Sequence, residues 1–152
     1  MARESARWWK SRRLQELGGI LVCIGALVAA LALLSYDAED ATWFHRQADG
    51  VAPHNWIGRF GATVAEALLQ LFGTASFLLP ALAAVLGGER LRQRGPALRR
   101  LGGFALLTLA LAAMLDLVYP GIHYGGDDFP AGGYAGARLA GLARGLLNVP
   151  GA

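Results

Sequence analysis

The side chains with the clearest capacity for chemistry are two histidines that share a polar stretch, residues 35–56, with several carboxylates. The histidines are His45 and His54, and the carboxylates are Asp37, Glu39, Asp40 and Asp49. Imidazole and carboxylate groups are ligands of protein-bound zinc, so this composition suggests a metal site. The histidines are nine positions apart, which matches none of the usual ligand spacings. We therefore favour histidines that are solvated in a loop.

Other arrangements of catalytic residues are not evident in the sequence. A nucleotide-binding phosphate loop needs the pattern G-xxxx-G-K-[ST], and the only lysine, Lys10, lies near the amino terminus. The single cysteine, Cys23, lies in an apolar run and has no partner for a disulfide. His123, close to Asp127 and Asp128, is most simply part of a solvated turn. We expect no catalytic residue, metal or cofactor in this chain, and hence no enzyme activity.

The composition is that of a membrane protein. Hydrophobic residues make up 55% of the 152 positions and charged residues only 16%, and the mean hydropathy is +0.39. The net charge of +3 does not indicate nucleic-acid binding, because the positive residues gather in two short segments beside apolar runs. Basic segments in that position are typical of contact with anionic lipid headgroups. The lipid bilayer is therefore the first predicted partner.

The two basic segments predict the orientation in the membrane. They are a tail, residues 1–16, and a hairpin, residues 89–100, and they contain ten of the fourteen Lys and Arg residues. The residues on which the topology rests are Arg7, Lys10, Arg12, Arg13, Arg90, Arg92, Arg94, Arg99 and Arg100. Short segments rich in Lys and Arg stay on the cytoplasmic side of a bacterial membrane. We therefore predict an inner-membrane protein with a cytoplasmic amino terminus, and outer loops at 35–56 and 119–133.

The apolar runs between these segments predict membrane-spanning helices. Residues 17–34 contain no charge and extend ~27 Å as a helix, close to the thickness of the hydrocarbon. Residues 101–118 form a similar span. Residues 57–88 combine an amphipathic helix with a span, and the polar residues of that helix recur at helical spacing: Arg59, Thr63, Glu66 and Gln70. Residues 134–152 predict a second amphipathic helix and the start of a further span.

The two halves of the chain show an internal repeat. Arg12-Arg13 before Leu17-Gly18-Gly19 matches Arg99-Arg100 before Leu101-Gly102-Gly103. A shift of 75 positions also aligns two glycine-rich helices: Gly58, Gly61, Ala62 and Ala65 with Gly133, Gly136, Ala137 and Ala140. Each half enters the membrane from the inside, which makes the repeat parallel. The predicted fold is an all-α, polytopic transmembrane protein of two parallel repeats, each a span, an amphipathic helix and a span, with the fourth span truncated.

One ordered set of residues runs through most of the chain: Ser35, Tyr36, Asp37, Asp40, Trp43, Asn55, Gly58, Gly61, Ala62, Gly73, Pro80, Gly132, Gly133 and Gly136. This set resembles the amino-terminal membrane domain of FtsK-type (FtsK/SpoIIIE family) DNA translocases. The resemblance implies a four-span inner-membrane anchor that acts in cell division and chromosome partition. It also implies placement at the division septum, contact with septal membrane proteins and self-association as a hexamer. ATP and DNA would be bound only by a separate cytoplasmic motor.

Two functions from different classes follow from these patterns. In the first, the chain is a non-catalytic anchor and targeting domain. In the second, it is a small multi-span transporter or channel subunit whose path is lined by the polar face that begins at Arg59 and ends at Gln70. Ionisable residues inside a membrane are functional candidates by default. Because these residues lie toward the outer side and not at mid-membrane, we favour the anchor.

Overall fold

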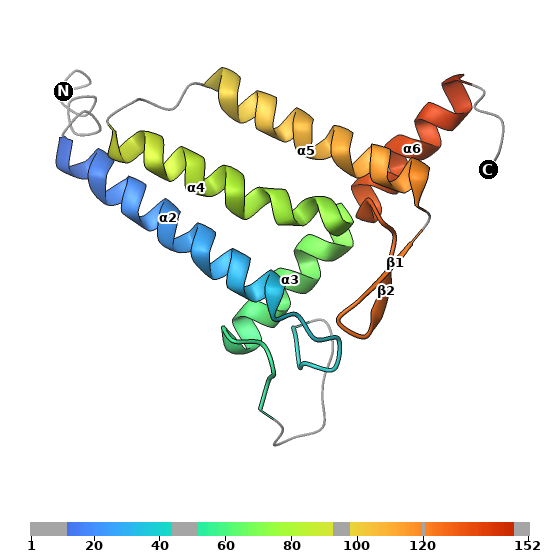
Figure 1. Ribbon diagram of the computed structural model, residues 1–152, viewed down its shortest axis with the longest axis horizontal. Helices are drawn as coiled ribbons and strands as arrows, with labels where there is room; N and C mark the ends of the chain where they lie inside the picture. Colours follow the sequence, from blue (N-terminus) through green and yellow to red (C-terminus); the bar gives the residue numbers. More distant parts are fainter. Residues whose placement is uncertain (1–11, 44–51, 93–97, 120, 148–152) are drawn as a thin grey trace.

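The computed structural model describes residues 12–43, 52–92, 98–119 and 121–147, and Figure 1 shows the order of its elements. Most of these residues are helical. The helices are α2 (Arg12–Leu34), α3 (Gly58–Phe72), the short 3-10 helix η1 (Gly73–Phe77), α4 (Leu78–Leu91), α5 (Leu98–Val118) and α6 (Gly133–Leu147). Two short strands, β1 (Ile122–Tyr124) and β2 (Asp127–Phe129), connect α5 to α6.

Three helical segments of the described chain are long and apolar enough to cross a membrane. They are Arg13–Leu34, Gly58–Leu91 and Arg100–Val118. The first helix begins at Arg12, five residues before the apolar run, so its basic first turn extends beyond the hydrocarbon-length part. The second segment is 34 residues long, more than the ~20 that a bilayer needs, and it includes α3, η1 and α4. The mostly helical, membrane-spanning class predicted from the sequence is confirmed.

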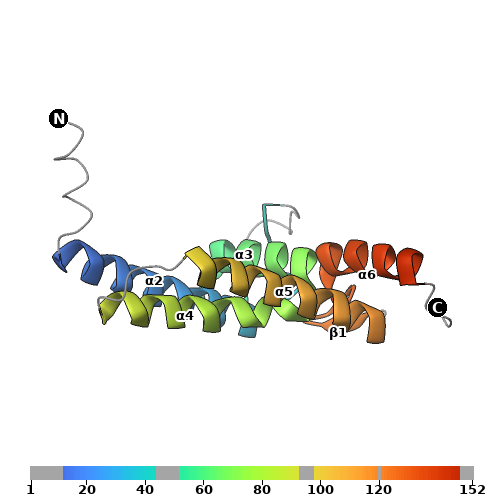
Figure 2. The same ribbon diagram turned by 90° about the horizontal axis from the view of Figure 1, so that it is seen from above.

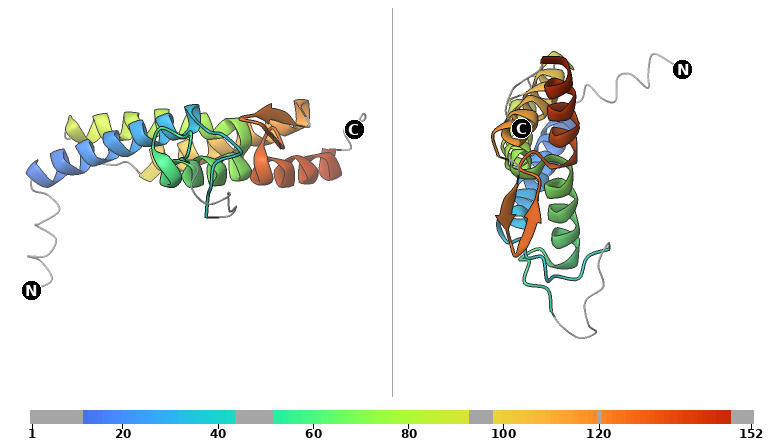
Figure 3. Two further views of the ribbon diagram at one scale, coloured as in Figure 1. Left: turned by 90° about the horizontal axis from the view of Figure 1, so that it is seen from below. Right: turned by 90° about the vertical axis from the view of Figure 1, so that its right-hand side faces the viewer.

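The helices form two layers. In one layer, α4 lies between α2 and α5, with α2 packed along its length (Figure 1). In the other layer, α3 and α6 lie end to end in a single row, which Figure 2 and the right-hand view of Figure 3 show from two directions. This row crosses the ends of α2 and α5 that lead into the loops, and α3 contacts α2 while α6 contacts α5. The second layer therefore holds the ends of the spans together.

Glycines allow α2 and α4 to pack closely. A Cβ on Gly19 would lie 2.9 Å from the Gly87 carbonyl oxygen, and one on Gly87 would lie 2.5 Å from the Cys23 Sγ. Small residues at such crossings bring helix backbones together where water cannot drive their association. Gly25, also in α2, has no neighbour within 4 Å of a Cβ position.

The second segment changes direction between α3 and α4. Gly73 follows the last residue of α3 and has a φ of +56°, a conformation that L side chains rarely adopt, and it is the first of the five residues of the 3-10 helix η1. Pro80 lies in the first turn of α4, where backbone N–H groups have no intrahelical partner in any case. Pro80 therefore fits in the first turn of α4 without loss of a hydrogen bond, and Gly73 forms the bend between α3 and α4.

The chain also contains a small sheet that the all-α prediction lacks. β1 and β2 pair antiparallel, with Ile122 opposite Phe129 and Tyr124 opposite Asp127. The turn between them is Gly125-Gly126, with φ values of +60° and +89°. Two positive φ angles are what a tight type I′ hairpin turn requires, and Gly-Gly supplies them without steric cost. The predicted outer loop at 119–133, with its solvated turn at His123, is therefore a β-hairpin.

The described residues of the two basic segments lie at one end of the spans. The starts of α2 and α5 and the end of α4 lie together, away from the hairpin (Figure 1). Arg13 and Arg92 are exposed there, and Arg100 pairs with Glu89 across the α4–α5 connection. The Nη1 of Arg90 lies 3.2 Å from where a Cβ on Gly18 would be. The backbones of Arg12 and Arg99 lie in these helical ends, whereas Arg7, Lys10 and Arg94 are outside the described residues. Which side of the membrane this end occupies stays a prediction.

Candidate functional site

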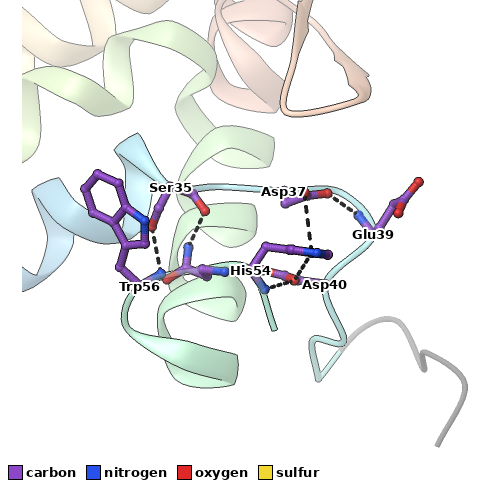
Figure 4. A network of polar contacts seen from close by, with 7 residues as sticks. Ser35, Asp37, Glu39, Asp40, His54 and Trp56 are labelled. Carbon is purple, nitrogen blue, oxygen red and sulfur yellow. Dashed lines mark hydrogen bonds and ion pairs between the residues drawn. The ribbon is translucent and has the colours of Figure 1, made fainter. Parts of the chain in front are cut away.

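A buried carboxylate organises the chain between α2 and α3. Asp40 is 1% exposed. Its Oδ1 accepts a hydrogen bond from the His54 backbone N–H at 2.6 Å, and its Oδ2 accepts one from the Asn55 backbone N–H at 2.7 Å. Figure 4 shows these contacts with their neighbours. Hydrogen bonds to an ionised group are among the stronger ones in proteins, so Asp40 fixes the segment that enters α3.

Asn55 connects this segment to the end of α2. Its Nδ2 donates to the carbonyl oxygens of Ala32 at 2.8 Å and Ser35 at 3.1 Å, and its Oδ1 accepts from the Ile57 N–H at 3.0 Å. The last carbonyls of a helix have no partner within the helix, and a buried amide satisfies them here. Ser35 adds a second connection, because its Oγ donates to Leu31 and accepts from the Trp56 N–H at 3.0 Å.

Small residues at the start of α3 make room for this set of bonds, which we call the Asp40–Asn55 network (Ser35, Asp37, Asp40, His54, Asn55 and Trp56). Gly58 has a φ of +71°. A side chain on Gly61 would clash with Asn55 Oδ1, and Ala62 is completely buried. The motif residues Ser35, Asp40, Asn55 and Gly61 therefore belong to one structural unit.

The histidines do not form a metal centre in the described part of the chain. His54 Nδ1 lies 3.3 Å from Asp40 Oδ1 and 3.6 Å from Asp37 Oδ2, and the His54 side chain is 58% exposed. His45 and Asp49 lie outside the described residues. His123 Nδ1 lies 3.0 Å from Asp128 Oδ1 on the exposed hairpin. Within the described ranges, no group of three or more His, Cys, Asp or Glu side chains is placed to hold a metal ion.

The polar face of α3 is divided between the interior and the surface. Thr63 and Glu66 are buried, whereas Arg59 and Gln70 are exposed. Thr63 Oγ1 donates to the Arg59 carbonyl at 2.8 Å and accepts from the Trp43 N–H at 3.3 Å. Gln70 Nε2 donates to Glu66 Oε1 at 3.1 Å. These polar groups therefore bind the preceding loop and one another, and Trp43 itself points its side chain, 75% exposed, toward the surroundings.

The β-hairpin packs on the same end of α2. The Tyr36 and Tyr124 rings are stacked at 6.2 Å, and the edge of Phe129 meets Tyr36 at 5.7 Å. Tyr124 donates from its hydroxyl to the Leu33 carbonyl at 2.8 Å, and the Ala38 N–H donates to the Gly125 carbonyl at 2.7 Å. The hairpin, which lies in the second predicted outer loop, therefore packs on the first predicted outer loop. The Gly-Gly dipeptide between two short β-type runs was the sequence signal for this hairpin.

Burial raises the pKa of both stacked tyrosines. For Tyr36 the raised pKa comes first from burial and then from nearby carboxylates, of which Glu66 is the strongest. For Tyr124 burial alone raises the pKa. A phenol whose pKa is higher in the folded state stays protonated at a pH where the unfolded chain has already lost that proton. Stability contributed by these groups is therefore complete below pH 10 and falls as the pH rises above it.

We expect the unfolding temperature of the detergent-solubilised chain to fall as the pH rises above about 10, where free tyrosine titrates. Tyr36→Phe removes the hydroxyl whose pKa is raised both by burial and by nearby carboxylates. The unfolding temperature of this variant should therefore decrease less with pH. Tyr134→Phe is the matched control, because Tyr134 is 59% exposed on α6. Equal pH profiles for the two variants would contradict the assignment to Tyr36.

A second set of motif residues lies where α3, η1, α5 and α6 meet. We call this set the glycine crossing (Gly73, Gly132, Gly133 and Gly136). A Cβ on Gly73 would clash with Ala131, and one on Gly132 or Gly136 would clash with the Ala112 carbonyl of α5. Thr74 donates to the Ala131 carbonyl from its backbone N–H at 3.0 Å and from its Oγ1 at 2.9 Å. The crossing joins the two halves of the chain through backbone contact.

Beside the crossing, a partly buried pair links α5 to α6. Asp116 is 6% exposed, and its carbonyl accepts a hydrogen bond from Arg144 Nη2 at 3.0 Å. Arg144 Nη1 lies 4.0 Å from Asp116 Oδ2. The remaining motif residue, Pro80, lies apart from both sets, at the start of α4. The arrangement contains structural connections at two places and no catalytic geometry among the described residues.

Comparisons with known proteins identify the relatives of this chain. Residues 11–152 match the family model described as the 4TM region of DNA translocase FtsK/SpoIIIE. Relatives named DNA translocase FtsK include those of Pseudomonas syringae pv. syringae (34% identical, 91% of this chain), Pseudomonas putida (36%, 91%) and Pseudomonas aeruginosa (33%, 99%). The chain spans 18%, 17% and 20% of these relatives, respectively. No solved structure matches the chain. The chain thus belongs to the family of the 4TM region of DNA translocase FtsK/SpoIIIE.

Proposed function

We propose that this chain is the inner-membrane anchor and targeting domain of a septal DNA translocase that acts in cell division and chromosome segregation. The observation that carries the proposal is the family match over residues 11–152, which coincides with three apolar helices of membrane-spanning length. The relatives are named DNA translocases and are about five times longer than this chain. In this proposal the motor lies outside the chain, and the chain itself hydrolyses no ATP.

The anchor is proposed to consist of two parallel repeats with four spans in total. The geometry that supports this is the row formed by α3 and α6, each of which crosses the end of the preceding span. The Asp40–Asn55 network fixes α3 to α2, and the Asp116–Arg144 pair fixes α6 to α5. The glycine crossing then joins the repeats. Such a rigid connection suits a domain that must resist a pulling force.

An anchor is favoured over a transporter by where the polar groups of α3 lie. A transport path needs polar side chains along a cavity at mid-membrane. Thr63 instead bonds Trp43 of the loop that precedes α3, and Glu66 is buried about one turn farther along the same helix. The groove between α2 and α4 is also lined by apolar residues. We therefore do not propose a transport function.

The orientation is tested by cysteine labelling in a Cys23→Ala background. Glu39 and Arg92 are exposed at opposite ends of the spans. With the basic end in the cytoplasm, an impermeant thiol reagent should label Glu39→Cys in spheroplasts and Arg92→Cys only in inverted vesicles. The reverse pattern would overturn the predicted topology.

Targeting is tested by fluorescence microscopy of dividing cells. A fluorescent protein is fused to the amino terminus, which is predicted to be cytoplasmic, and the fusion is expected to gather at the septum. An unrelated multi-span protein with the same fusion is the control and should label the membrane evenly. An even distribution of both fusions would contradict a targeting role. A measurable ATPase activity of the purified chain would contradict its non-catalytic nature.

A further inference from the structure

The membrane-spanning layer contains an apolar groove between α2 and α4. The groove has a volume of about 460 Å³ and is open along one side. Alanines line the groove on both helices, among them Ala26 and Ala30 on α2 and Ala81 and Ala84 on α4. Each alanine leaves space that a larger side chain at that position would fill. The packing of the two helices, close at Gly19 and Gly87, therefore opens into a hollow farther along.

The groove covers half of the membrane thickness. Its lining residues on α2 begin at Cys23 and end at Leu34, the last residue of the helix. Twelve residues of helix extend ~18 Å, a little more than half of a ~30 Å hydrocarbon core. The end at Leu34 lies next to Ser35, which holds the Trp56 backbone, and the Trp56 side chain is 69% exposed. Exposed tryptophan is typical of the headgroup level.

The size and chemistry of the groove select its occupant. Twelve residues of an α-helix of ~10 Å diameter occupy ~1,400 Å³, about three times the volume of the groove. A helix therefore fits only across its mouth, whereas a single hydrocarbon chain fits within it. The lining residues have no charged side chains, and the Cys23 thiol is only a weak hydrogen-bonding group. An occupant at this depth must therefore be apolar.

We propose that the α2–α4 groove binds one acyl chain of a phospholipid from the leaflet on the Trp56 side, with the headgroup at the level of Trp56. Burial of each CH₂ group of such a chain against protein replaces contacts with mobile lipid, and close packing along a fixed groove gains dispersion contacts. Phe77 lines the groove and packs edge-on against Tyr124 at 5.7 Å. The bound chain therefore contacts a residue that also holds the β-hairpin, and lipid binding should stabilise the hairpin end of the molecule.

The test uses variants that fill the groove. The chain is purified with dioleoyl phosphatidylethanolamine, and the lipid that is retained through detergent exchange is counted by native mass spectrometry. The wild type should retain one lipid per chain, and the double variant Ala30→Leu/Ala81→Leu should retain at least five-fold less. Ala105→Leu/Ala110→Leu is the matched control, because both alanines are exposed on α5 away from the groove, and it should retain the lipid as the wild type does.

A second measurement separates lipid binding from effects on folding. Helix content is compared by circular dichroism, and added lipid should raise the unfolding temperature of the wild type and the control but not of the filled variant. Glycerophosphoethanolamine, which has the headgroup but no acyl chain, should raise none of them. Equal lipid retention by the filled variant and the wild type would overturn the proposal. So would a groove-dependent dimer that retains no lipid, since a second copy would then occupy the groove. Neither result depends on septal targeting.

Discussion

Gly136→Ala is expected to destabilise the folded chain by ~3 kcal/mol or more, because the added methyl group would overlap the Ala112 carbonyl of α5. The nearest neighbours of this position are backbone and Cβ atoms of Ala112, which cannot rotate away. Relief requires α5 and α6 to separate, and that separation would also lengthen the Asp116–Arg144 contact. The free energy of unfolding in detergent micelles measures this loss.

Gly141→Ala on the same helix is the matched control. Nothing lies within 4 Å of a Cβ at Gly141, so the same substitution there adds no overlap. Alanine has a higher helix propensity than glycine by ~1 kcal/mol, so the control should stabilise the chain slightly. The two variants are therefore expected to change stability in opposite directions. If both raise the free energy of unfolding, the close approach of α5 and α6 is incorrect.

Asp40→Ala should have a comparably large effect, ~3 kcal/mol or more, on the free energy of unfolding. The substitution removes the acceptor of two backbone N–H groups, the buried one of Asn55 and the part-buried one of His54. Each buried donor that loses its partner costs ~1–3 kcal/mol. Because Asn55 connects this segment to the end of α2, we also expect faster proteolysis of the loop before α3.

Asp37→Ala serves as the control for Asp40. Its carboxylate accepts a hydrogen bond from the Glu39 N–H at 2.9 Å in an exposed position, and its side chain is 37% exposed. Water can replace that contact, so the expected loss is below ~1 kcal/mol. Asp40→Asn keeps one acceptor oxygen and should lie between the two. A loss for Asp40→Ala no larger than for Asp37→Ala would show that the buried carboxylate does not organise the loop.

Hydrophobic and charge patterns were sufficient to predict the membrane-spanning class. The uncharged run of residues 17–34 and the similar run of 101–118 lie in helices α2 and α5. Such patterns are local, because the length of an apolar run relative to the bilayer decides whether it spans. The ordered motif residues were likewise sufficient to suggest the family to which the chain belongs. The resemblance depended only on the order of these residues in the sequence and required no knowledge of their contacts.

The hairpin and the fate of individual polar residues were not predicted. The Gly125-Gly126 turn is a local signal, but two three-residue strands have too little hydrogen bonding to be stable alone. They are held by the stacking of Tyr124 on Tyr36, a residue 88 positions earlier in the chain. The sequence likewise grouped Thr63 and Glu66 with Arg59 on one polar face, and only the packed loop separated them into buried and exposed groups.

The sequence by itself determined that the chain contains membrane-spanning helices and which family it belongs to, because hydrophobic length and residue order are properties of short segments. Only the tertiary structure decided what the motif residues do. Asp40 and Asn55 are 15 positions apart and become hydrogen-bonded partners, and Gly73 and Gly133 are 60 positions apart and meet backbone to backbone. Contacts of this kind depend on how helices cross, and a crossing is set by the shapes of both surfaces together.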